Sequence, residues 1–280
     1  MLGKHKLHAW KLLLLLVLVP VLGQAEPPVY KLAIVPQYTP LFIFRNWRPL
    51  VEEVQKETGI RLDIITYKNF NQFLKALEKG EPDFSYMSPY HLMMARRQQE
   101  YTPLLRDSEK KLVGIVVVPT GSKLKDINDL QGKTIAFPSP TAFAASLYMR
   151  AWLREKVGID FTPRYVGTHG NVYRSVAHNF ASAGGGVNST LDSQPKSLQK
   201  SLKILYEIPG VASHPLAVHP RVSLKVRNTL SKAIYAMSKT EKGKALLSAV
   251  QIAKPVEANY IDDYSFLEKL NLDKYRRVKK

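Results

Sequence analysis

The chain has 280 residues, of which 45% are hydrophobic and 10% aromatic, and its formal net charge is +18. This composition supplies enough apolar side chains for a sizeable core and excludes wholesale disorder. The absence of cysteine excludes disulfides, thiolate metal sites, cysteine nucleophiles and a lipid-modified cysteine.

Residues 1–25 are interpreted as a secretory signal peptide. Three lysines precede an almost unbroken apolar run over residues 12–22, and small residues stand at Gly23 and Ala25. The run is too short for a stable membrane span, although a retained N-terminal anchor is the alternative. Cleavage after Ala25 would leave 38 Lys and Arg against 23 Asp and Glu, a net charge of +15. In an exported protein this charge favours anionic solutes or an anionic membrane surface over nucleic acid.

The chain then alternates predicted strands and helices, which indicates parallel α/β layers. Strands are predicted at residues 31–35, 61–66 and 83–87, and residues 37–46 are interpreted as a loop. Apolar stripes at helical spacing predict one helix that ends at Gly59 and another that ends at Gly80. A third helix is expected over residues 91–99, where His91 has a structural role. The β-branched run at residues 112–118 is interpreted as a crossover into a second domain.

The second domain begins with a short capped helix at residues 126–131. Further strands are predicted at residues 135–137, 162–166, 181–187 and 202–208. The prolines and glycine between Pro209 and Pro215 indicate a second crossover, which returns the chain to the first domain near residue 214. Helices then follow, and the basic run at residues 274–280 is expected to be a solvated tail.

Residues 135–148 carry the most informative pattern. A buried strand is stopped by Pro138 and Pro140, and from Thr141 the composition favours a helix. A helix N-terminus offers free backbone N–H groups and the positive end of its dipole, so it can seat an anion. The alternative is that Ser139 or Thr141 simply caps an ordinary helix.

His169 lies at a similar junction and could donate a hydrogen bond to an oxyanion, or could be a loop or capping histidine. The histidine spacings predict no metal site, and we expect no cofactor. A serine hydrolase is disfavoured because no Gly-x-Ser-x-Gly elbow is present and no third group joins Ser139 and His169. Gly132-Lys133-Thr134 is no Walker loop, because Ile127 stands where the motif requires glycine.

Taken together, these segments resemble the periplasmic solute-binding proteins of phosphonate, phosphite and phosphate ABC importers. The resemblance extends over most of the chain after residue 31. It is carried by Val35-Pro36-Gln37, Trp47-Arg48-Pro49-Leu50, residues 80–90 (Gly-Glu-Pro-Asp-Phe-Ser-Tyr-Met-Ser-Pro-Tyr), residues 137–141 (Phe-Pro-Ser-Pro-Thr), residues 165–169 (Tyr-Val-Gly-Thr-His) and residues 209–215 (Pro-Gly-Val-Ala-Ser-His-Pro).

The resemblance implies a type II two-lobe periplasmic binding protein fold, in which each lobe is a mostly parallel sheet flanked by helices and two crossover strands join the lobes. We therefore expect lobe 1 to comprise residues 26–118 and 214–280, and lobe 2 residues 119–213. The implied function is capture of a small tetrahedral oxyanion in the interlobe cleft, by a non-enzymatic monomer that serves an ABC permease in the inner membrane. The predicted ligand-binding residues are Ser139, Thr141, Ala142, His169, Tyr90, Tyr38 and Gln37.

Four positions depart from the family pattern. Pro140 and Ala142 replace hydroxyl residues, Gly170 follows the histidine where aspartate is common, and Ser182 replaces an acidic residue. An amine-bearing ligand would need an acceptor there, so these changes favour a fully ionised ligand without an amine. Two other functions stay open at this point: an exported sensor of the same fold that signals to a membrane kinase, and a phosphate-ester hydrolase.

Overall fold

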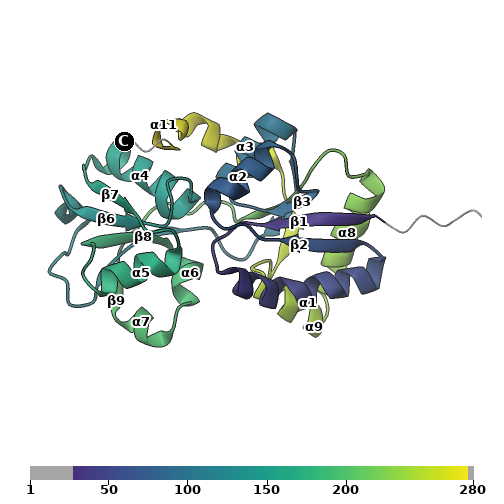
Figure 1. Cartoon of the computed structure of the whole chain (residues 1–280), viewed down its shortest axis with the longest axis horizontal. Helices are drawn as coiled ribbons and strands as arrows, with labels where there is room; N and C mark the ends of the chain where they lie inside the picture. Colours follow the sequence, from purple (N-terminus) through teal and green to yellow (C-terminus); the bar gives the residue numbers. More distant parts are fainter. Residues whose placement is uncertain (1–27, 277–280) are drawn as a thin grey trace, which may run out of the picture.

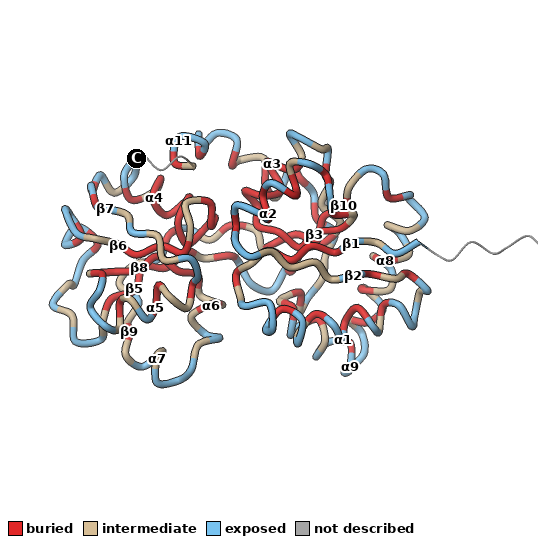
Figure 2. The backbone as a smooth tube through the Cα atoms, viewed as in Figure 1, coloured by how far each residue is buried: buried red, intermediate tan, exposed pale blue. Residues whose placement is uncertain are grey.

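The structure, a computed structural model, describes residues 28–276. The signal peptide predicted for residues 1–25 lies outside them. The described chain forms two lobes that stand side by side and are joined by thin connections (Figure 1). Buried residues concentrate in the central strands of each lobe, while exposed residues follow the outer turns (Figure 2). Between residues 28 and 276, no helix is both long and apolar enough to cross a membrane.

The first lobe is built on a six-stranded sheet of order β11-β4-β10-β3-β1-β2. Strand β1 pairs in parallel with β2 and β3, whereas β10 and β11 pair antiparallel with their neighbours. The strands are β1 (Val29–Ile34), β2 (Arg61–Ile65), β3 (Phe84–Tyr86), β4 (Thr102–Asp107), β10 (Pro215–Val218) and β11 (Pro255–Glu257).

The second lobe has a five-stranded sheet of order β7-β6-β8-β5-β9. Here β6 pairs in parallel with β7 and β8, and β5 runs antiparallel to β8 and β9. Each sheet is thus parallel at its βα units and antiparallel next to the crossovers, where the chain reverses direction. The strands are β5 (Gly114–Pro119), β6 (Thr134–Phe137), β7 (Thr162–Tyr165), β8 (Ala183–Val187) and β9 (Leu202–Glu207).

Helices flank both sheets. In the first lobe they are α1 (Pro40–Thr58), α2 (Phe70–Glu78), α3 (Pro89–Gln99), α8 (Leu224–Met237) and α9 (Glu241–Ala249). In the second lobe they are η1 (Ile127–Leu130), η2 (Phe143–Leu147), α4 (Tyr148–Trp152), η3 (Leu153–Val157), α5 (His169–Ala177), α6 (Asn188–Asp192) and α7 (Lys196–Lys200). The chain ends with α10 (Tyr260–Asp263), η4 (Ser265–Leu270) and α11 (Asp273–Arg276).

Helix α1 begins earlier than the sequence predicts. The loop expected at residues 37–46 is helical from Pro40, because Thr39 caps the helix by accepting from the N–H of Phe42 and Pro40 supplies a first-turn proline. The predicted end is confirmed, since Gly59 has φ 71° and occupies the left-handed C-cap.

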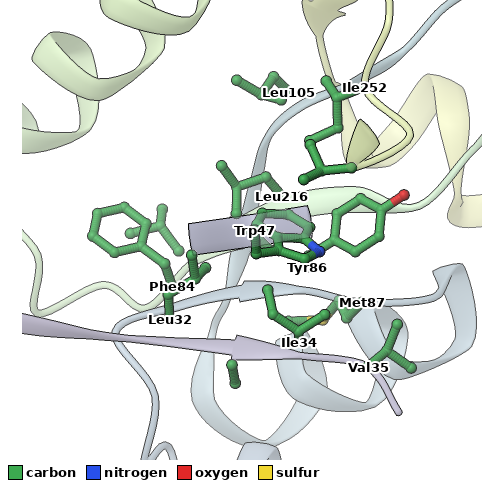
Figure 3. Packing of buried hydrophobic residues seen from close by; sticks show 14 of the residues in the cluster. Leu32, Ile34, Val35, Trp47, Phe84, Tyr86, Met87, Leu105, Leu216 and Ile252 are labelled. Carbon is green, nitrogen blue, oxygen red and sulfur yellow. The ribbon is translucent and has the colours of Figure 1, made fainter. Parts of the chain in front are cut away.

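The core of the first lobe fixes the strands whose ends carry site residues (Figure 3). Trp47 from α1 packs on Tyr86 of β3, with ring centroids 5.0 Å apart. Leu32, Phe84 and Leu216 from three adjacent strands are each at most 3% exposed. Truncation of such a residue to alanine typically costs about 2–5 kcal/mol, so this packing holds β1 and β3 in a defined register.

Two crossovers connect the lobes, between β4 and β5 and between β9 and β10. Leu112 and Val211 join them by a pair of backbone hydrogen bonds of 2.9 and 3.1 Å. The run at residues 112–118 lies mostly in β5, which is hydrogen-bonded within the second sheet from Gly114. The division of the lobes at residues 118 and 214 stays a prediction.

Candidate ligand site

A small cavity lies between the two lobes. The first lobe lines it with the end of β1, the start of α2 and the β3–α3 junction; the second lobe lines it with the start of η2, with α5 and with β8. Both crossovers reach it as well. No Lys, Arg, Asp or Glu side chain is among its described lining residues, which are Val35, Gln37, Phe70, Ser88, Leu112, Ala142, Phe143, Ala144, Ala145, His169, Val187 and His214.

One wall of the cavity is the beginning of the helix formed by η2, α4 and η3. No side chain caps this end, where Ala142 occupies the N-cap position. The N–H groups in the first turn of a helix have no acceptor within that helix, and the dipole places partial positive charge there. Phe143, Ala144 and Ala145 are 3%, 3% and 1% exposed. Buried donors of this kind suit an anion.

Two glycines bring this helix start against the second sheet. A Cβ atom at Gly185 of β8 would lie 2.2 Å from the carbonyl oxygen of Ala145, and one at Gly114 of β5 would lie 2.5 Å from that of Ala144. No side chain larger than hydrogen fits at either position. The glycine run at residues 184–186 is therefore a closely packed strand that positions the helix start.

Three buried histidines surround the cavity. His169 and His214 line it, and each is at most 4% exposed. Nε2 of Gln37 donates to Nε2 of His214 at 2.7 Å. His91 stands behind Ser88, whose Oγ lies 2.7 Å from its Nδ1, and its Nε2 is buried without a partner. His91 thus has a structural role, as predicted, but it adjoins the site.

Burial keeps these imidazoles neutral at pH 7. It lowers the pKa of His169 to about 4 and the pKa values of His91 and His214 to about 3, because removal from water disfavours the charged form. Nδ1 of His169 lies 3.3 Å from Oγ1 of Thr190, which itself donates to the carbonyl of Val187. If Nδ1 carries the proton of His169, Nε2 is left with a lone pair.

The hydroxyls of Ser139 and Thr141 face each other instead of lining the cavity. The two oxygens are 3.3 Å apart, and Oγ of Ser139 also accepts from the N–H of Thr141. The loop is held from behind by Arg150, which donates to the carbonyl of Pro140 at 2.6 Å. Ala142, the next residue, does line the cavity. A direct ligand contact of Ser139 or Thr141 stays a prediction.

The residues predicted from the first lobe lie in three different places. Gln37 lines the cavity. Tyr38 closes one side of the interlobe contact, where its hydroxyl accepts from Nε2 of Gln251 at 2.5 Å and donates to the carbonyl of Ser189 in the other lobe at 3.5 Å. Tyr90 is fully buried away from the lining, and its hydroxyl donates to Asp273 at 3.3 Å.

Sequence analysis missed Phe70, Ser88 and His214 as lining residues. Ser88 belongs to residues 80–90 and His214 to residues 209–215, two of the segments that support the resemblance. Both segments were recognised, but the side chain that faces the other lobe depends on how each segment turns. The signal that could have found His214 is a histidine beside a crossover.

A family model described as ABC transporter, phosphonate, periplasmic substrate-binding protein matches residues 32–264. The chain belongs to this family. Its members are periplasmic substrate-binding proteins, so the chain is a periplasmic binding protein and not an enzyme, and it works with the permease of an ABC importer. Within residues 28–276, no group of three or more His, Asp or Glu residues is arranged to hold a metal ion.

Solved structures of this kind share the fold of the binding protein. A phosphonate-transporter binding protein from Pseudomonas aeruginosa aligns with a TM-score of 0.78 at 14% identity, over 90% of each chain. PhnD1 from Prochlorococcus marinus, in complex with methylphosphonate, aligns with a TM-score of 0.80 at 14% identity, over 89% of this chain and 99% of that one. A Xanthomonas citri protein with bound chloride gives 0.73 at 16% identity, over 89% and 98%. The expected type II two-lobe fold is confirmed.

Proposed function

We propose that this binding protein captures a small tetrahedral oxyanion without an amine, of the phosphonate, phosphite or phosphate class, in the interlobe cavity. The observation that carries the proposal is the wall formed by Ala142 to Ala145, an uncapped and buried helix start that faces buried histidines. Charge-assisted hydrogen bonds from backbone N–H groups in a desolvated site are stronger than neutral ones. A neutral cavity with such donors is selective for negative charge.

The lining also argues against an ammonium group on the ligand. A buried cation needs a carboxylate or several acceptors, and no Asp or Glu side chain is among the described residues that line the cavity. The departures at Gly170 and Ser182 agree with this interpretation. Aminoalkylphosphonates should therefore bind more weakly than methylphosphonate, phosphite or phosphate.

Delivery follows from closure of the lobes. Two contacts cross between the lobes. The rings of Phe70 and His169 lie 6.3 Å apart between centroids, and the hydroxyl of Tyr38 donates to the carbonyl of Ser189. A hinge at the crossovers would open these contacts, admit the ligand and close over it. We further propose that the chain is exported by cleavage after Ala25, remains monomeric and presents its closed form to the inner-membrane permease.

The test is a thermal-shift screen followed by calorimetry with methylphosphonate, phosphite, phosphate, aminoethylphosphonate and sulfate at constant ionic strength. We expect at least one of the first three to raise the melting temperature, and His169→Leu to remove most of that rise. His178→Leu is the matched control, because His178 is an exposed histidine at the end of the same helix. If none of the oxyanions stabilises the protein more than chloride does, the proposal is wrong.

A further inference from the structure

The C-terminal residues 265–276, here called the strap, lie across the gap between the two lobes. Figure 1 shows α11 between α4 of the second lobe and α3 of the first. The segment just before the strap is fixed to the first lobe. Tyr264 is fully buried and donates to the carbonyl of Ser213 at 2.9 Å, and Asp263 pairs with Arg106 at 2.7 Å. The strap therefore starts from a firm base on one lobe.

The far end of the strap packs into the second lobe. Leu267, Leu272 and Tyr275 are 0%, 2% and 6% exposed, and they belong to an apolar cluster that spans both lobes, with Tyr90 and Met93 of α3 on one side and Tyr148 and Met149 of the α4 region on the other. The hydroxyl of Tyr275 donates to Glu155 at 2.8 Å, and Lys274 pairs with the same carboxylate. The expectation of a solvated tail is thus wrong for residues 274–276, because Tyr275 is buried.

Polar contacts tie the same segment back to α2 and α3 of the first lobe. Arg97 pairs with Glu268 and with Asp273, each at 3.3 Å, and Arg276 pairs with Glu78 at 2.8 Å. Such partly exposed pairs contribute about 0–1 kcal/mol each, so these ion pairs are the weak part of the attachment.

Arg150 connects the strap to the loop that precedes the helix start. Its guanidinium donates to the carbonyl of Tyr275 at 2.7 Å and to the carbonyl of Pro140 at 2.6 Å, while Nε donates to Oγ of Ser146 at 3.1 Å. Arg150 is 4% exposed, and no carboxylate among the described residues pairs with it. A buried cation held only by neutral oxygens gains when an anion arrives nearby.

We infer that the strap clamps the two lobes in their closed arrangement and that Arg150, as a positioning residue, couples docking of the strap to the loop at residues 139–141. The inference rests on the proposed oxyanion site. Coupling between two binding events is reciprocal, so the strap strengthens ligand binding by the same factor by which ligand strengthens docking of the strap. When the lobes open about the hinge, the strap must lose its contacts with one of them.

The experiment compares two truncations of the full chain by calorimetry with methylphosphonate and with phosphate. A chain that ends at Leu272 loses every contact of residues 273–276, and we expect about tenfold weaker binding, within the usual range of coupling between sites. A chain that ends at Arg276 loses three basic residues but keeps all of these contacts, so its affinity should stay within about twofold.

Point variants and exchange measurements separate coupling from loss of folding. Arg150→Lys keeps the charge but cannot hold three oxygens in one plane, so it should weaken binding about as much as the truncation does. Combining Arg150→Lys with the truncation after Leu272 should weaken ligand binding little more than either change alone. Arg154→Lys, an exposed arginine one turn later, should leave it unchanged. In the intact chain, saturating methylphosphonate should slow hydrogen exchange in residues 265–276.

The outcomes are distinct. If no oxyanion binds the intact chain, the proposed function fails and the inference fails with it. If methylphosphonate or phosphate binds but the chain ending at Leu272 binds it equally well, or if exchange in the strap is unchanged by ligand, only the coupling is wrong. Additive losses in the double variant would likewise overturn a shared pathway through Arg150.

Discussion

Gly185→Ala should damage both the stability of the protein and its ligand site. The new Cβ would lie 2.2 Å from the carbonyl oxygen of Ala145 and 2.6 Å from the ring of Phe137. Non-bonded heavy atoms settle at about 3.5 Å, so a displacement of roughly 1 Å is required. Strand β8 cannot supply it, because it is hydrogen-bonded to β5 and to β6. The helix start must move instead.

The expected cost lies at the upper end of the range for overpacking, about 3 kcal/mol, because a backbone carbonyl cannot rotate away as a flexible side chain can. Moving the N–H groups of Phe143 to Ala145 by that amount should also weaken the ligand's charge-assisted hydrogen bonds, each worth about 1.5–3 kcal/mol. Affinity for methylphosphonate should then fall at least about tenfold, since 1.4 kcal/mol corresponds to a factor of ten.

Urea unfolding measures the first effect and calorimetry the second. Gly121→Ala is the matched control: a Cβ there has no neighbour within 4 Å and the backbone is not left-handed, so its stability should change by less than about 1 kcal/mol. An unchanged urea midpoint for Gly185→Ala would show that the helix start is not held by this contact and would refute the account of the glycine run.

Three further predictions concern pH and closure. Because burial lowers the pKa values of His91, His169 and His214 from 6.5 to about 3, 4 and 3, the unfolded chain binds more protons than the folded one below pH 6.5. Stability should therefore be complete above pH 6.5 and fall by about 2 kcal/mol per histidine by pH 5, which urea titrations at several pH values will measure. With the proton of neutral His169 on Nδ1, an oxyanion can accept from Nε2 only if the ring gains a second proton. Binding should hence take up a proton, seen as a dependence of the calorimetric heat on buffer ionisation enthalpy after the ligand's own ionisation is subtracted; no dependence would contradict it. Tyr38→Phe should weaken binding about fivefold by removing one interlobe hydrogen bond worth about 1 kcal/mol, whereas equal affinity would place Tyr38 outside the closed state.

The alternation of strands and helices was predictable because each buried element carries its own periodicity. The stripes that end at Gly59 and Gly80 are examples. Strand β4 was not predicted, because Pro103, Arg106 and Asp107 interrupt any apolar alternation and its pairing with β10 and β11 is non-local. The short helices α6 and α7 have too few residues for a helical stripe to stand out.

The candidate site was predictable at the level of junctions but not of side chains. Ala142, His169 and Gln37 line the interlobe cavity, as expected for strand ends that converge on one edge of α/β sheets, and their contact with the ligand stays a prediction. Tyr90 lies one helix position beyond Pro89, and its direction depends on the phase of α3, which the sequence does not specify. Burial of Tyr275 was hidden by the basic residues around it.

The π-helical turn η2 at the cavity has a consequence for the length of the chain. In this turn the N–H of Leu147 reaches back five residues to Ala142, where an α-helix would reach back four. The turn thus holds one residue more than an α-helical turn. Deleting Ala144 would let the helix close as an ordinary α-helix, and every residue before it would rotate by about 100° relative to Arg150. The carbonyl of Pro140 would then no longer reach the guanidinium of Arg150, and different atoms would face the cavity. The one additional residue in this turn therefore determines which groups face the ligand.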